Sequence, residues 1–209
     1  MVPFTVFYSD DTPAGAGLDD ARLLALVRFE ERTPAQSDPQ AVTVALAELG
    51  GTRTAEIWRS TRPVQIGVRA GIRHASDGEA LFLHLRLDEY TLDALQPLTA
   101  TAYRRLSAVA GALGYPHFLR IWHYFPQINR EYQGVERYRA FCVGRYQALE
   151  AELTAFETQL PAASAIGTDS PGLQLYALAA KEPGMQIENP RQVSAFHYPP
   201  QYGHRSPSF

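Results

Sequence analysis

The amino-acid sequence predicts an α+β fold, in which two long helices lie on one face of a mixed β-sheet and a strand-rich region comes before them. Three observations support this prediction. Short β-rich segments fill the chain up to residue 87, two later stretches have the helical spacing of apolar residues, and single strands separate and follow those stretches. Helices that connect strands in this way pack against one face of the sheet.

The N-terminal strands are recognised as short apolar runs that lie between turn signals. Residues 33–40 contain Pro34 and Pro39 and are predicted to form a loop. The turn signal Ser-Asp-Gly at residues 76–78 comes before a segment with strand alternation. The sequence therefore predicts strands at residues 4–8, 24–29, 42–46, 55–58, 64–72 and 80–87.

Two segments of the second half have the period of an amphipathic helix. Residues 91–113 carry leucines and other apolar residues at helical spacing, and Gly114 follows as a stop signal. Residues 134–156 have a similar pattern, which ends before Leu160-Pro161. Strands are predicted at residues 118–125, 163–166 and 173–179. We therefore expect residues 80–180 to form a four-stranded mixed sheet that carries both helices on one face.

This order of elements divides the chain into three regions. Residues 1–79 are strand-rich, residues 80–180 form an α/β unit, and residues 181–209 form a linker rich in proline and glycine. The early strands either extend the sheet of the second region or form a small accessory lobe, and the sequence leaves both arrangements open.

Composition and charge argue against several classes of function. The net charge of −3 gives no general reason to expect nucleic acid or a membrane surface as a partner. No apolar run has the length of a membrane span. A single cysteine cannot form an intramolecular disulfide, so a reducing, cytoplasmic location is predicted. One cysteine and six scattered histidines give no zinc-binding pattern, and no glycine-rich phosphate-binding motif is present.

Arg145 is the most informative single position. On the predicted helix it lies inside a stripe of apolar side chains and not on the polar face. A buried guanidinium is costly unless it is paired, so Arg145 either has a structural partner or faces a cleft that binds a carboxylate. Both interpretations stay open. The stripe consists of Val135, Tyr138, Phe141, Cys142, Leu149, Leu153 and Phe156.

Other chemically distinctive side chains have simpler explanations. Cys142 lies in the middle of the helix, where a free cysteine is expected to pack as a small hydrophobe and not to act as a nucleophile. His123 and His197 lie among aromatic residues and are expected to pack or to cap. Tyr202 lies in a proline-rich segment without periodicity, so core packing explains it less well and a cleft-lining role is considered.

From residue 80 onward, the order of elements and several short motifs resemble a RidA/YjgF-like subunit. Leu-Arg-Ile-Trp at residues 119–122 matches its middle strand, and Pro-Ala-Ala-Ser-Ala-Ile-Gly at residues 161–167 matches its Pro-x-x-Ser strand. RidA-like deaminases carry an arginine at the third position of that strand, where this sequence has Ala163. A methyl group cannot hold a substrate carboxylate, which argues against a deaminase pocket.

Longer motifs look like those of the chorismatase family, whose members are also called 3-hydroxybenzoate synthases. The resemblance is close from residue 119 to residue 209 and loose before it. The motifs are Trp-His-Tyr-Phe-Pro-Gln-Ile-Asn at residues 122–129, Glu-Arg-Tyr-Arg-Ala-Phe-Cys-Val-Gly-Arg at 136–145, Glu-Asn-Pro-Arg-Gln-Val-Ser-Ala at 188–195, and the segment 198–209.

The resemblance implies that the parent protein converts chorismate to pyruvate and a hydroxybenzoate or a dihydroxycyclohexadiene carboxylate. It implies general acid–base chemistry without a metal or an organic cofactor. It also implies a second RidA-like unit that carries the catalytic glutamate, so this chain is expected to pack against that unit or another chain and to be inactive alone. The substrate-binding residues expected from this chain are Arg145, Tyr138, Tyr202 and Arg205.

The sequence leaves two other functions open. A RidA-like unit without its arginine could serve as a non-catalytic binding or scaffold module. An imine deaminase is the third possibility, and Ala163 argues against it.

Overall fold

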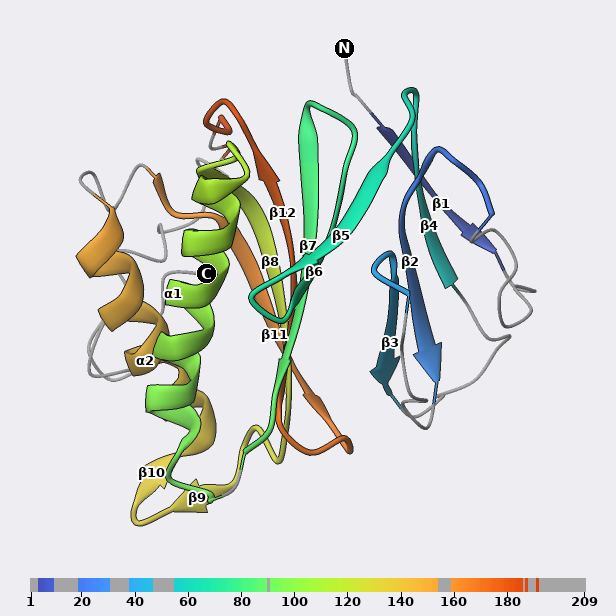
Figure 1. The fold of residues 1–209 in the computed structure, drawn as a ribbon. Helices are drawn as coiled ribbons and strands as arrows, with labels where there is room; N and C mark the ends of the chain where they lie inside the picture. Colours follow the sequence, from blue (N-terminus) through green and yellow to red (C-terminus); the bar gives the residue numbers. More distant parts are fainter. Residues whose placement is uncertain are drawn as a thin grey trace.

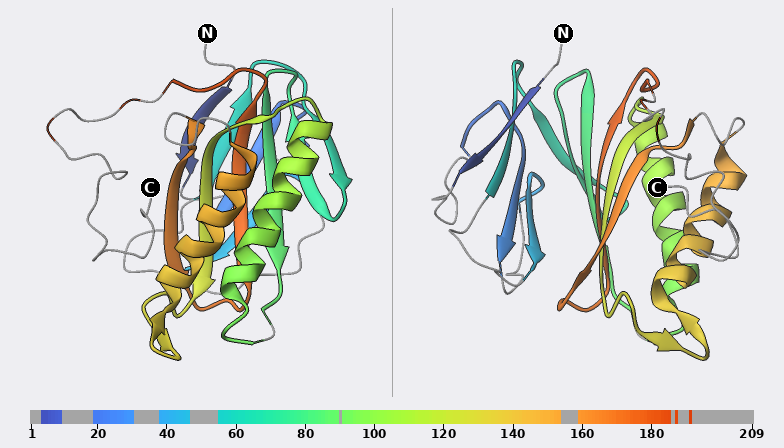
Figure 2. Two further views of the ribbon diagram at one scale, coloured as in Figure 1. Left: turned by 90° about the vertical axis from the view of Figure 1, so that its left-hand side faces the viewer. Right: turned by 180° about the vertical axis from the view of Figure 1, so that it is seen from behind.

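The structure is a computed structural model that describes residues 4–9, 19–30, 38–46, 55–89, 91–153, 159–185, 187 and 191. These residues form three layers (Figure 1). Helices α1 (Leu95–Ala112) and α2 (Arg137–Glu152) form the first layer, a six-stranded sheet forms the second, and a four-stranded sheet forms the third. The two views in Figure 2 show that both helices cover the same face of the central sheet.

The central sheet has the strand order β11-β8-β12-β7-β6-β5. Among its described strands, β11 and β8 pair in parallel, whereas β12 lies between β7 and β8, antiparallel to both. The two helices connect strands of this sheet, because α1 follows β7 and α2 lies between β8 and β11. The strands are β5 (Gln65–Arg69), β6 (Ile72–Ser76), β7 (Ala80–Leu87), β8 (His117–Pro126), β11 (Ala162–Thr168) and β12 (Leu173–Ala180).

The α+β class, with two helices on one face of a mixed sheet, is confirmed. Residues 80–180 contribute the four neighbouring strands β11, β8, β12 and β7, as expected, and β6 and β5 extend the sheet to six strands. The single strand predicted at residues 64–72 is wrong. Ala70 and Gly71 have φ angles of 50° and 74°, so the chain turns back between β5 and β6. Positive φ at both central residues is the signature of a two-residue hairpin loop.

Strands β1 (Phe4–Ser9), β2 (Leu23–Glu30), β3 (Ala41–Ala45) and β4 (Ala55–Ser60) form the separate four-stranded sheet, in the order β1-β4-β2-β3. The N-terminal strands therefore adopt both of the arrangements that the sequence left open. Four of them form an accessory layer, and the next two extend the central sheet. The accessory layer covers the face of the central sheet opposite the helices (Figure 1).

Aromatic rings fill the space between the two sheets. Trp58 of β4 makes edge-to-face contacts with Phe82 of β7 and Trp122 of β8, at centroid distances of 5.8 and 5.5 Å. Trp122 in turn stacks on Tyr176 of β12 at 4.8 Å. Edge-to-face and stacked pairs add to the stabilisation that burial of the rings provides. The two sheets therefore share one apolar core.

Polar contacts fix how the two sheets meet. Ser60, at the end of β4, donates a hydrogen bond of 2.7 Å to Asp77 in the turn between β6 and β7. The same carboxylate accepts backbone N–H groups of Glu79 and Ala80, which shapes that turn. Elsewhere between the sheets, the Gln174 amide nitrogen donates to the backbone carbonyl of Thr43 at 3.0 Å.

The positions of both predicted helices are confirmed, with differences at their ends. The helix predicted at residues 91–113 is α1, which begins at Leu95. The helix predicted from residue 134 is α2, which begins at Arg137 because β9 (Glu131–Tyr132) and β10 (Val135–Glu136) form a short hairpin before it. Residues 154–156, at the end of the second predicted helix, lie outside the described residues.

A buried ion pair anchors the first turn of α2. The two Nη atoms of Arg137 donate to the carboxylate of Glu89 at 2.8 and 2.6 Å, and the two side chains are 1% and 5% exposed. Arg137 also donates to the backbone carbonyls of Leu92 and Pro126 at 3.0 and 3.2 Å. The guanidinium thus joins the start of α2 to the end of β8 and to the segment before α1.

We predict that Glu89→Ala lowers the free energy of unfolding by about 3–5 kcal/mol, because it leaves the buried Arg137 charge without its counter-ion. The matched control is Glu79→Ala, which removes an ion pair with Arg62 whose side chains are 54% and 51% exposed. The control should cost less than about 1 kcal/mol. Urea unfolding of both variants checks this, and equal losses would contradict the structural role of the Glu89–Arg137 pair.

His84 of β7 is a second buried polar group, and it lies between the two sheets at 2% exposure. The amide nitrogen of Gln174 lies 3.2 Å from its Nε2 atom. Burial, followed by the charges of Arg73 and Arg86, lowers the pKa of His84 to about 3. The imidazole is therefore neutral in the folded protein at neutral pH.

We predict that this burial makes the protein less stable in weak acid. Below about pH 6.5 the unfolded chain protonates His84 while the folded chain does not, so stability is lost as the pH falls from about 6.5 toward about 3. Between about pH 6.5 and about pH 5, His84 alone should contribute a loss of about 1.5 kcal/mol. Urea unfolding at both pH values should show that His84→Asn has a smaller pH-dependent loss than the wild type. Identical losses would show that His84 is not buried in its neutral form.

Candidate functional site

Three polar side chains meet in the apolar layer between the helices and the central sheet. Tyr103 comes from α1, Arg145 from α2 and His123 from β8, and they are 0%, 1% and 0% exposed. Apolar side chains surround them, and Phe141 of α2 packs edge-to-face on the His123 ring at 4.9 Å. Buried polar groups are costly unless they are hydrogen-bonded, so their mutual contacts decide whether this arrangement is tolerated.

A continuous chain of hydrogen bonds links the three residues to the edge of the sheet. Arg145 donates from Nε to the Tyr103 hydroxyl oxygen at 2.9 Å. The Tyr103 hydroxyl lies 2.7 Å from His123 Nε2, and His123 Nδ1 lies 2.7 Å from the backbone carbonyl of Ser164 on β11. Four elements of secondary structure therefore meet through one polar chain.

Among the side chains linked by these hydrogen bonds, Arg145 carries the charge. Burial, followed by the nearby Arg145 charge, lowers the pKa of His123 to about 3, although the hydrogen bond to Ser164 acts in the opposite direction. Burial raises the pKa of Tyr103, partly offset by Arg145. Both side chains are neutral near pH 7, whereas a guanidinium stays protonated. An electropositive group thus lies in low-dielectric surroundings, where it attracts an anion more strongly than in water.

The local sequence explains how these side chains come together. Alternation along β8 directs Ile121, His123 and Phe125 to the helix side of the sheet, and all three are 0% exposed. Gly144 lets the two helices approach closely, because a Cβ atom at this position would lie 2.2 Å from the backbone oxygen of Gln96. The close approach places Arg145, the next residue, within hydrogen-bonding distance of α1.

Tyr138 and Cys142 lie on the same face of α2 as Arg145. Tyr138 is partly buried and hydrogen-bonds with Cys142, and its pKa is raised, first by burial and then by Cys142. Cys142 is 7% exposed, and burial raises the pKa of its thiol to about 11. A thiol with a raised pKa is a poor nucleophile, so the prediction that Cys142 packs as a small hydrophobe is confirmed.

The structure thus places two of the four residues predicted to bind substrate. Arg145 is buried on the predicted apolar stripe, and Tyr138 lies two turns before it on the same helix. Tyr202 and Arg205 lie outside the described residues. The described residues contain no group of three or more His, Cys, Asp or Glu side chains that could hold a metal ion. No helix in the described ranges is long and apolar enough to cross a membrane.

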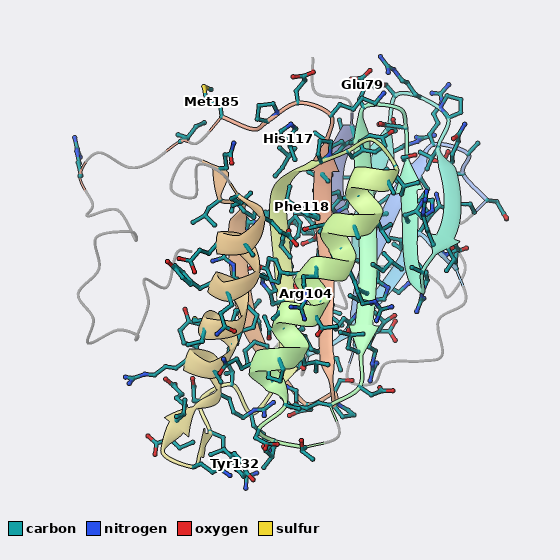
Figure 3. All side chains as sticks on the ribbon, turned by 60° about the vertical axis from the view of Figure 1, so that its left-hand side comes forward. Glu79, Arg104, His117, Phe118, Tyr132 and Met185 are labelled. Carbon is teal, nitrogen blue, oxygen red and sulfur yellow. The ribbon has the colours of Figure 1, made fainter. Side chains whose placement is uncertain are left out.

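Sequence reasoning missed Tyr103 as a member of this arrangement and placed His123 only as a packed residue. Tyr103 lies on the apolar stripe of the first predicted helix, where a tyrosine is most simply a core ring. One feature of the sequence could have identified the arrangement. Tyr103, His123 and Arg145 each carry polar atoms on the apolar face of a predicted helix or strand, and these faces are expected to pack together. In Figure 3 the neighbouring Arg104 lies on the exposed side of α1, which shows how narrow the buried stripe is.

The chain is similar to known chorismatases along most of its length. A family model described as "Chorismatase FkbO/Hyg5-like, N-terminal" matches residues 56–179. A 3-hydroxybenzoate synthase from Streptomyces hygroscopicus is 39% identical over 160 residues, which are 74% of this chain and 45% of that protein. A chorismatase from the same organism is 39% identical over 156 residues, which are 74% of this chain and 44% of that protein.

This chain is also similar to a chorismatase of known structure. The crystal structure of a chorismatase superposes with a TM-score of 0.84 and 31% identity, covering 99% of this chain and 62% of that one. A member of the YjgF protein family from Neisseria meningitidis also matches, with a TM-score of 0.40 and 12% identity, over 57% of this chain and 95% of that one. The chain spans less than half the length of the curated relatives that it matches. The family match and the 0.84 superposition show that this chain belongs to the chorismatase family.

Proposed function

We propose that this chain is part of an enzyme that converts chorismate to pyruvate and a cyclic carboxylate, and that Arg145 binds a carboxylate of the substrate. Membership of the chorismatase family supports the reaction. The structural observation that carries the proposal for Arg145 is its burial, at 1% exposure, in the mainly apolar core cluster between the helices and the central sheet. The relatives named as chorismatase and 3-hydroxybenzoate synthase support the substrate.

The proposed chemistry is acid–base cleavage of the ether that links the enolpyruvyl group to the ring. In the hydrolytic route, protonation of the enolpyruvyl methylene makes the ether carbon electrophilic, water adds to that carbon, and the resulting hemiketal collapses to pyruvate and the ring hydroxyl. In the elimination route, protonation of the ether oxygen lets the bond between that oxygen and the ring break, the enol of pyruvate leaves, and the ring loses a proton and becomes aromatic. Release of pyruvate and a hydroxybenzoate consumes no net water, because ring aromatisation supplies the hydrogen atoms. Release of pyruvate and a dihydroxycyclohexadiene carboxylate consumes one water molecule. Both outcomes stay within the proposed function.

The residues of this chain are proposed to bind substrate and not to supply the catalytic acid. Arg145 and Tyr138 on α2, with Tyr202 and Arg205, are the proposed binding residues. The catalytic glutamate is proposed to lie in a second RidA-like unit, since the curated relatives are more than twice as long as the matched stretch. This chain is proposed to pack against that unit or against another chain. A cytoplasmic location stays a prediction from the single cysteine.

We predict that Arg145→Ala in the full-length enzyme lowers kcat/KM for chorismate by about 1.5–3 kcal/mol, or roughly 10- to 150-fold, the effect of one lost hydrogen bond to a charged group. The matched control is Arg139→Ala on the same helix, whose side chain is 46% exposed. Steady-state pyruvate release and thermal unfolding should be measured on the same preparations. A loss of stability with normal kcat/KM per folded molecule would assign Arg145 a structural role only.

We further predict that the 209-residue chain, purified alone, releases no pyruvate from chorismate, whereas the full-length enzyme does. The physical reason is that the proposed general acid is absent from the reaction mixture. A coupled lactate dehydrogenase assay measures pyruvate, and circular dichroism confirms that the chain is folded. Pyruvate release by this chain would place the catalytic acid within residues 1–209.

A further inference from the structure

We propose that Arg73, His84 and Arg86 form a binding site for a small oxyanion, such as inorganic sulfate, inorganic phosphate or a carboxylate, between the two sheets. The site lies on the face of the central sheet opposite Arg145, so the inference goes beyond the proposed function and does not depend on it. The observation behind it is a pair of buried nitrogen atoms, His84 Nδ1 and Arg73 Nη1, that have no hydrogen-bond partner among the described residues.

The strand register places these three side chains on one face of the central sheet. Arg73 on β6 and His84 on β7 are direct partners in an antiparallel ladder, so their side chains share a face. Arg86 lies two residues after His84 on β7 and therefore shares that face as well. Gln174 is the partner of Arg86 on β12, and its hydrogen bond to the Thr43 carbonyl of β3 shows that this face meets the accessory sheet.

The contacts of Gln174 decide which ring nitrogen of His84 carries the hydrogen atom. A backbone carbonyl can only accept, so the amide nitrogen of Gln174, and not its oxygen, faces Thr43 at 3.0 Å. The same nitrogen lies 3.2 Å from His84 Nε2 and donates its second hydrogen atom there. Because the imidazole is neutral, its own hydrogen atom is on Nδ1, which is therefore a buried donor that requires an acceptor.

The surroundings of this donor are electropositive. After burial, the charges of Arg73 and Arg86 are the causes that lower the pKa of His84, so both guanidinium groups lie near the imidazole. Burial also lowers the pKa of Arg73, and the nearby Asp38 carboxylate offsets this effect only in part. Positive charge in partly buried surroundings attracts an anion more strongly than it does in water.

The two arginines connect the buried imidazole to solvent. Both Arg73 and Arg86 are partly exposed, whereas His84 is 2% exposed. Arg86 is held in place because its Nη2 atom donates to the Ser170 hydroxyl oxygen at 3.0 Å and to the Pro171 carbonyl at 3.2 Å. An oxyanion that enters past the arginines accepts from the guanidinium groups and, at the inner end, from His84 Nδ1. N–H donors beside positive charge suit an oxyanion and repel a cation.

Thermal unfolding in sodium sulfate tests the site, with sodium chloride added to hold the ionic strength constant. We expect sulfate to raise the Tm in a saturating manner, by about 3–6 °C at about ten times its dissociation constant, because only the folded protein binds it. Arg73→Gln should abolish this rise. The matched control is Arg62→Gln, since Arg62 is 54% exposed and pairs with Glu79 at the surface, and this variant should keep the full response. A rise of equal size in all three proteins would overturn the proposal.

Two further salts, sodium phosphate and sodium acetate at the same ionic strength, identify the class of anion. A saturating response to sulfate and phosphate alone assigns the site to inorganic oxyanions, and a response to acetate extends it to carboxylates. If the Tm of the wild type is the same in all four salts, water satisfies these donors and the proposal is wrong.

A spectroscopic measurement on the wild type keeps the test decisive if Arg73→Gln does not fold. Long-range proton–nitrogen correlation spectra separate the two ring nitrogens of each histidine, and His84→Asn identifies the His84 signals. We expect the Nδ1 signal to shift with the same half-saturation concentration of sulfate as the Tm. The Nε2 signal should move less, because it keeps its hydrogen bond from Gln174. An Nδ1 signal that stays in place throughout the titration contradicts the proposed site.

Discussion

The whole structure depends on the burial of the central sheet on both faces. The helices cover one face and the N-terminal sheet covers the other, so β7, β12 and the second half of β8 have little contact with water. Any polar side chain on these strands must find a partner inside the protein. His84 and Gln174 do so between the two sheets, and His123 does so below the helices. Burial on both faces thus explains why both histidines have strongly lowered pKa values.

Burial also determines the position of the Arg145 charge in the helix layer. Gly144 permits the two helices to pack so closely that Arg145 reaches the Tyr103 hydroxyl instead of solvent. The buried pair of Arg137 and Glu89 fixes the start of α2 relative to the sheet, two turns before Arg145. Both Nη atoms of Arg137 hold the Glu89 carboxylate, so Arg137 has its counter-ion within this chain and is not proposed to bind substrate.

The accessory sheet gives the chain a self-contained core of three layers. A sheet with one apolar face left open requires a partner to cover it, whereas here Trp58 and its aromatic neighbours fill that face from within the chain. The chain spans less than half the length of the curated relatives that it matches. The second unit that we propose is expected to complete the substrate site and not to complete this core.

The sequence by itself determined the elements and much of the chemistry. Apolar periodicity located both helices, turn residues separated most of the strands, and the apolar stripe on α2 was enough to predict that Arg145 lies on a buried face. Local patterns could not show that residues 64–72 turn back at Ala70-Gly71, because alanine is an unusual residue at positive φ. Nor could they show that Tyr103, His123 and Arg145 meet. These residues lie on three elements, and their contact depends on the register of β8, the packing of α1 against it, and the close approach at Gly144, all of which only tertiary packing decides.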